Sequence, residues 1–168
     1  LRPCSYLVPM WSPPLEVEPL CRQATLVAEL YARPLTDTTP IGGVPTGPRG
    51  HEWRATAPAT LMWAEALDEG DPKQQVPHRD AVMALDAPFD GDPREVVKTE
   101  YRYRGTRWLD DSGRALVSEY DRDLRWVRAW LMDLDAPGSE PKLVVDRDIQ
   151  DRYADAGDPV IRPDEHGQ

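Results

Sequence analysis

The sequence predicts an all-β fold, and within that class a partial β-propeller of about three blades that does not close into a ring. The first observation is the content of 18 prolines in 168 residues, which leaves few uninterrupted helix-length windows and excludes a helical bundle. The second is a series of short apolar runs separated by turns rich in Asp, Gly and Pro. The third is an internal repeat of roughly 50 residues, which is typical of propeller blades.

The expected strands follow one another at short intervals along the chain. Each mixes apolar or aromatic residues with polar ones and stops at a turn sequence, in which Gly supplies positive φ, Pro restricts φ and Asp bonds its own backbone. The segment 125–134 is also long enough for a helix, but its aromatic content and the absence of a clean apolar stripe favour a strand. Strands are thus expected at residues 24–31, 59–66, 81–85, 94–103, 114–120, 125–134 and 142–145.

Two copies of a repeat are the basis of the propeller prediction. Leu-Asp-Ala-Pro occurs at residues 85–88 and again at 134–137, and upstream of each copy a Trp precedes a Leu by eight residues (Trp53 and Trp108). Each copy is interpreted as Trp, turn, strand, hairpin, strand, Leu-Asp-Ala-Pro turn and strand, with a longer hairpin connection in the first copy. A blade buries its two apolar faces only against neighbouring blades, so repeated units of this kind favour a propeller. The alternative is a β-sandwich whose hairpins share a tetrapeptide by chance.

We therefore expect residues 1–168 to be a fragment of one propeller domain. Residues 53–97 and 108–145 are the repeated blade units, and residues 146–168 are expected to start a further blade. Residues 34–50 contain four Pro and four Gly in 17 positions, which predicts a long loop. Because the chain begins with Leu1 and not with Met, we also expect it to be an excised or partial sequence.

Charge and composition limit the partners. The net charge of −10 is concentrated in residues 133–168, so a nucleic-acid partner, which requires a basic surface, is not expected. No window has the 18 or so apolar residues of a membrane span, and no membrane partner is expected. Cys4 and Cys21 are compatible with one disulfide or with two thiols, and the compartment stays open.

Searches for catalytic and ligand-binding patterns give no site residue. None of the five serines has the Gly-x-Ser-x-Gly context of a hydrolase nucleophile, and His51-Glu52 lacks the second His of a zinc protease. The Asp-rich stretch from Asp146 fails the EF-hand pattern at its Gly and Glu positions. The segment 101–104, Tyr-Arg-Tyr-Arg, is interpreted as a strand with aromatic side chains on one face and arginines on the other. We expect no catalytic, cofactor-binding or metal-binding residue, and no cofactor.

Several irregular segments resemble a known family. Residues 39–49, Thr-Pro-Ile-Gly-Gly-Val-Pro-Thr-Gly-Pro-Arg, are followed by Trp53-Arg54 and by residues 59–68, Ala-Thr-Leu-Met-Trp-Ala-Glu-Ala-Leu-Asp. Residues 76–80, 133–137, 151–155 and 157–160 continue the likeness. Together these segments, over roughly residues 15–163, resemble the N-terminal β-propeller of the prolyl oligopeptidase family of serine peptidases, in its glutamyl-endopeptidase-like branch.

The resemblance implies a role without catalytic residues. In that family the Ser-His-Asp triad lies on a C-terminal α/β-hydrolase domain, which is absent from this chain, so we expect the chain to be inactive alone. The propeller covers the active site and admits peptide-sized substrates, which makes peptide substrate and the missing α/β-hydrolase domain the expected partners. Arg49, His51 and Arg79 are loop residues considered for the substrate side, without assignment as sites. The alternative is a self-contained β-sandwich-like binding module for peptide or carbohydrate.

Overall fold

The computed structural model describes residues 26, 28–33, 39–109, 112–136, 138–157, 159 and 160. Within these residues the regular structure consists of eight strands and no helix, and accordingly no helix there has the length and apolarity needed to cross a membrane. The strands are β1 Arg49–Trp53, β2 Thr60–Ala66, β3 Asp80–Asp86, β4 Arg94–Thr99, β5 Arg102–Trp108, β6 Arg114–Asp121, β7 Trp126–Asp133 and β8 Lys142–Asp148.

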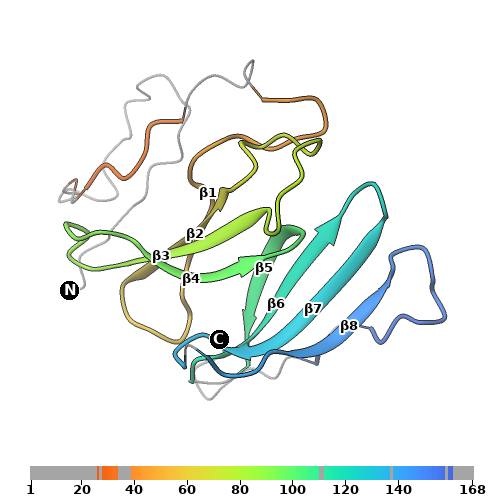
Figure 1. Cartoon of the computed structure of the whole chain (residues 1–168). Coiled ribbons are helices and arrows are strands. Elements are labelled where there is room, and N and C mark those ends of the chain that lie inside the picture. Colours follow the sequence, from red (N-terminus) through yellow and green to blue (C-terminus); the bar gives the residue numbers. More distant parts are fainter. Residues whose placement is uncertain are drawn as a thin grey trace, which may run out of the picture. The chain divides into compact units, whose positions relative to one another are not determined.

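The first compact unit, residues 1–100, contains one antiparallel sheet in the order β1-β2-β3-β4 (Figure 1). Its two central strands are buried on both faces, which explains why β2 is an apolar run without polar alternation. Leu61, Trp63 and Leu85 form the core cluster of this sheet, and the side chains of Leu30 and Phe89 pack against it. Consecutive strands are therefore joined by hairpins around one local core.

The connection between β2 and β3, residues 67–79, is long and is held by polar contacts. Asp68 is fully buried and accepts hydrogen bonds from the Gly70 amide at 3.1 Å and the Arg79 guanidinium at 2.9 Å. The Val44 amide donates to the Gly70 carbonyl at 3.0 Å, which ties the loop before β1 to this connection. The ion pair with Arg79 compensates the buried charge of Asp68, because a buried carboxylate without a partner would destabilise the fold.

The second unit, residues 101–168, contains the antiparallel sheet β5-β6-β7-β8 (Figure 1). On one face of β6, Ala115, Val117 and Glu119 are almost completely buried. Glu119 accepts hydrogen bonds from the Tyr101 amide at 2.9 Å and the Trp130 indole at 2.8 Å. These donors satisfy a carboxylate that is 1% exposed, and they join the beginning of β5 to β7.

The all-β, open propeller-like fold is confirmed. Each sheet is a meander of four consecutive strands, as in a propeller blade, and two such sheets are too few to close a ring. Trp53 and Trp108 occupy the same place, the last residue of the first strand of each sheet. The segment 125–134, for which a helix was the alternative, contains strand β7. The two sheets account for two of the roughly three expected blades, and the described residues contain no third sheet.

Several predicted boundaries differ from the structure. Residues 94–103 form parts of two strands, because the chain bends at residues 100 and 101, where the Tyr101 amide bonds to the Glu119 side chain and not to a ladder. Arg49 and Gly50, expected in the 34–50 loop, belong to β1, whose pairing with β2 outweighs their turn-forming composition. In the expected strand 24–31, the described residues 26 and 28–31 are not in a strand.

The remaining expectations concern residues near the two ends of the chain. Strand β8 extends to Asp148, so the boundary expected at residue 146 falls inside the fourth strand of the second sheet. Residues 149–157, 159 and 160 contain no strand, and a further blade beyond β8 stays a prediction. Cys4 and Cys21 lie outside the described residues.

Candidate functional site

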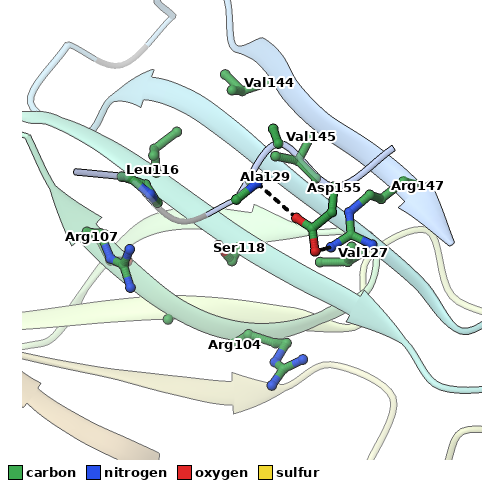
Figure 2. A pocket seen from close by; sticks show the side chains of 15 residues that line it. Arg104, Arg107, Leu116, Ser118, Val127, Ala129, Val144, Val145, Arg147 and Asp155 are labelled. Carbon is green, nitrogen blue, oxygen red and sulfur yellow. Dashed lines mark hydrogen bonds and ion pairs between the residues drawn. The ribbon is translucent and has the colours of Figure 1, made fainter. Parts of the chain in front are cut away.

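A cavity of about 650 Å³ lies on one face of the second sheet (Figure 2). The pairing of Ser118 with Ala129, and of Ala129 with Val145, places neighbouring side chains from β6, β7 and β8 on this face. Residues 155–157 and Pro159 also line the cavity. Its floor is apolar, formed by the side chains of Leu116, Val127, Ala129 and Val145.

A β-bulge brings two arginines to this cavity. Arg104 and Arg107 both line it, although residues three apart in a regular strand point to opposite faces. In β5 the pairing shifts between Tyr103, which is opposite Glu119, and Gly105, which is opposite Ser118. The bulge inserts one extra residue into β5 and so puts both arginines on one face, as bulges often do beside functional sites.

Both arginines are exposed to solvent, and an aromatic contact orients Arg104. The Arg104 guanidinium lies over the Tyr120 ring, 5.4 Å from its centroid, a cation–π contact that leaves its hydrogen-bond donors free for other partners. For Arg107, the described part of the chain provides no ion pair or hydrogen bond. Figure 2 shows both side chains at the β5 side of the cavity. The cavity therefore combines an apolar floor with two cations at one border.

Arg147, a third arginine of the lining, has a structural role. Its guanidinium donates hydrogen bonds to the carbonyls of Asp148 and Asp151 at 3.1 and 3.2 Å, and it forms an ion pair with Asp155 at 2.7 Å. Figure 2 shows Arg147 and Asp155 pointing toward one another. Asp155 also accepts the Gly157 amide at 3.0 Å, which closes a turn. Arg147 thus holds the segment after β8 against the sheet, and its charge is neutralised there.

Arg49, His51 and Arg79 were considered for the substrate side from the sequence. All three lie in the first unit, and each contacts another residue of that unit. Arg49 forms an ion pair with the fully buried Asp80, and Arg79 bonds Asp68. The His51 ring lies 6.0 Å from the Trp63 ring, centroid to centroid. Partial burial lowers the pKa of His51 from its usual 6.5, because the charged imidazolium loses solvation. These three residues belong to the first unit, whereas the residues that line the cavity belong to the second.

The Asp-rich stretches form turns. The Asp133 carboxylate accepts the amide of Asp135 at 3.0 Å, and that of Asp148 accepts the amide of Gln150 at 2.8 Å. Asp151 accepts the amide of Tyr153 in the same way, at 3.0 Å. These are Asx turns, in which an Asp side chain bonds the backbone two residues on. Among the described residues, no three His, Cys, Asp or Glu side chains are grouped to hold a metal ion.

The sequence predicts no cavity here and no site residue. The strand expected at 101–104 begins at Arg102 in the structure, and Arg104 is the arginine of that segment that lines the cavity. Arg107 and Arg147 were not singled out. The available signal was Gly105 within a strand pattern, since an isolated Gly there indicates a bulge.

Comparison with known proteins relates the chain to peptidases. It is 38% identical, over 165 residues and 96% of its length, to the probable chloroplastic glutamyl endopeptidase of Oryza sativa subsp. japonica. It is 36% identical, over 99% of its length, to the protein of the same name from Arabidopsis thaliana. In both cases the chain spans only 18% of the relative. No family model matches the chain, and no solved structure matches it.

The chain resembles endopeptidases over nearly its whole length, but it matches only a small part of each of them. Nearly every residue of the chain lies in the aligned region, whereas less than a fifth of each relative does. The chain is therefore similar to one short segment of two proteins named as probable glutamyl endopeptidases.

Proposed function

We propose that this chain is the non-catalytic, substrate-gating β-propeller portion of a serine peptidase of the prolyl oligopeptidase family, in its glutamyl-endopeptidase-like branch. The observation that supports this most strongly is the identity of 36–38% to a short segment of two glutamyl endopeptidases. The parent enzyme hydrolyses peptides on an α/β-hydrolase domain, and this segment restricts which peptides reach it.

The two sheets support a propeller portion over a sandwich. A Greek-key sandwich connects strands of two sheets alternately, whereas here β1–β4 and β5–β8 each form a sheet of consecutive strands. Each sheet has a Trp at the end of its first strand and a Leu-Asp-Ala-Pro sequence that starts at or just after the end of its third strand, which also suits successive blades. A self-contained binding module for peptide or carbohydrate remains the alternative that the experiment below addresses.

The serines of the described residues support a non-catalytic role. Ser112 accepts the Arg114 amide at 3.1 Å, and Ser139 donates to the Asp133 carbonyl at 3.4 Å. Ser118 lines the cavity from the middle of a strand, whereas a hydrolase nucleophile needs a sharp turn and a base within hydrogen-bond reach. His51 and His78, the described histidines, belong to the first unit.

A segment exchange tests the proposal. The matching segment of the Oryza relative is replaced by this chain, and hydrolysis of a short quenched glutamyl peptide is compared with that of casein. We expect the chimera to cleave the peptide and to discriminate against casein, and a deletion of the segment to lose that discrimination. The isolated chain should hydrolyse neither substrate and should not react with a fluorophosphonate probe.

Two results would contradict the proposal. Stoichiometric fluorophosphonate labelling of a serine in the isolated chain would show that it carries its own nucleophile. A chimera that cleaves casein as readily as the deletion variant does would show that the segment has no gating role.

A further inference from the structure

We infer that the outer edge of strand β8 is an isologous interface, at which β8 of one copy of the chain lies antiparallel to β8 of a second copy. The partner is a second copy because the exposed residues of β8 are complementary to themselves when the strand is reversed. The inference goes beyond the proposed function and does not rest on it, since it concerns one strand edge of the second unit.

The edge of β8 is open on one side. Strand β8 is the last strand of its sheet (Figure 1), and no other described strand pairs with its outer side. The unpaired N–H and C=O groups of an edge strand are a template for another strand. A propeller packs the faces of its sheets against one another and leaves short strand edges, so a neighbouring blade would not cover this edge.

Strand β4 occupies the same fourth place in the first sheet, and its edge is protected by charge. The exposed residues of β4 are Arg94, Glu95 and Lys98, all of them charged. Charged side chains on an edge strand oppose pairing with another chain. In β8, by contrast, two neighbouring exposed residues are apolar, with Leu143 at 40% and Val144 at 50% exposure. The second sheet therefore lacks the protection that the first sheet has.

A β-bulge places Val144 at the middle of this edge. The pairing of β8 with β7 shifts between Ala129 and Trp130, so Val144 is the extra residue and has no partner of its own in β7. The same shift occurs in β4, where the extra residue is Val96, but that residue is half-buried. The bulge thus leaves an exposed apolar side chain of β8 without a cross-strand partner in its own sheet.

The charges on β8 favour an antiparallel second copy. Lys142 precedes the apolar pair and Asp146 follows it, and both are exposed. When two β8 strands run antiparallel with Val144 opposite Val144, Lys142 of each copy lies opposite Asp146 of the other, because both are equally far from the centre. Opposite charges that face each other across strands stabilise the pairing, and this contact occurs twice in a two-fold dimer. A parallel in-register alignment would instead place Lys142 beside Lys142.

Cysteine cross-linking of the 168-residue chain tests the alignment. In a background with Cys4→Ser and Cys21→Ser, Val144→Cys should form a disulfide-linked dimer on mild oxidation. The reason is that directly opposite residues of antiparallel strands lie about 4.5–5.5 Å apart, within the range of a disulfide. Leu124→Cys is the matched control, because it lies in the β6–β7 turn of the same unit and is more exposed, at 61%. We expect the Val144→Cys dimer to form at least about tenfold faster, since pairing raises the effective concentration of the two thiols.

Charge exchange tests the contact between Lys142 and Asp146. Lys142→Glu and Asp146→Lys each place like charges opposite one another, so each variant alone should dimerise about tenfold more weakly in sedimentation equilibrium. An equimolar mixture of the two variants should dimerise as well as the original chain, because each contact between them again joins opposite charges. Arg122→Glu makes the same change of charge as Lys142→Glu in the β6–β7 turn and should alter the affinity less than about twofold.

Circular dichroism accompanies the charge exchange, because Asp146 also accepts a hydrogen bond from the Trp126 indole within its own sheet. If Asp146→Lys does not fold, the comparison of Lys142→Glu with Arg122→Glu and the cross-linking decide the inference.

Three results would overturn the interface: a chain that stays monomeric at its highest soluble concentration, equal cross-linking of the two cysteine variants, or a mixture of folded charge variants that dimerises no better than its components. Rapid cross-linking at Val144 together with restored dimerisation in the mixture would establish it. None of these results bears on gating, which the segment exchange decides separately.

Discussion

At the scale of single residues, buried carboxylates organise both units. Asp68 and Asp80 in the first unit are fully buried, and each is paired with an arginine. Glu119 in the second unit is 1% exposed and accepts hydrogen bonds from the amide of Tyr101, just before β5, and from the indole of Trp130 in β7. A buried carboxylate contributes to a unique structure only when it is paired, and each of these three has at least one hydrogen-bond or ion-pair partner.

The prediction at this scale concerns Glu119. Glu119→Gln retains one carbonyl oxygen but places an NH2 group opposite either the Tyr101 amide or the Trp130 indole, so one donor loses its acceptor. We expect a loss of about 1–3 kcal/mol in the free energy of unfolding. The exposed Glu140→Gln is the control and should change stability by less than about 0.5 kcal/mol. Urea unfolding followed by tryptophan fluorescence measures both, and equal stabilities would show that Glu119 is not a structural acceptor.

At the scale of elements, the long connection between β2 and β3 depends on close backbone contact. Gly70 has a φ of +74°, and a Cβ added there would overlap the carbonyl oxygen of Val44. At the same place the amide of Val44 donates a hydrogen bond to the carbonyl of Gly70. The loop before β1 and the β2–β3 connection therefore pack at a distance that only glycine permits.

Gly70→Ala tests this packing. We expect it to destabilise the chain by about 2–4 kcal/mol, since it combines an unfavourable φ with a backbone overlap. Gly91→Ala is the matched control, because an added Cβ there meets nothing within 4 Å and its φ is not left-handed. Its effect should stay within about 0.5 kcal/mol. Thermal unfolding of both variants decides the matter, and similar midpoints would contradict the proposed backbone contact.

At the scale of the whole molecule, both sheets end in strands with unpaired edges among the described residues. Strand β8 pairs only with β7, and Leu143 and Val144 on it are 40% and 50% exposed. An exposed apolar edge strand is a template for pairing with another chain. The net charge of −10 opposes such association but does not remove the edge.

We therefore expect the isolated chain to self-associate. Sedimentation should show oligomers that become fewer in Val144→Lys, since a charge on the edge opposes strand pairing. Leu124→Lys, at an exposed position in the β6–β7 turn, is the control and should leave the distribution unchanged. A monomer with one sharp, reversible transition near about 60 °C would instead indicate a complete domain and support the binding-module alternative.

The sequence by itself determined the strand content and its division into two similar units. Proline frequency, turn sequences and the repeated Leu-Asp-Ala-Pro are local signals, and they located β2, β3, β6, β7 and β8 because each strand has its own pattern and its own turn. Only the tertiary structure decided β1 and the cavity. Strand β1 forms because β2 supplies its hydrogen bonds, against a loop-like composition. Arg104 and Arg107 share a face because β5 must bulge to pair with β6, and Arg147 is neutralised because the chain returns to place Asp155 beside it. Such pairings join residues through space, and the local signal of Gly105 indicates a bulge without indicating which strand β5 pairs with.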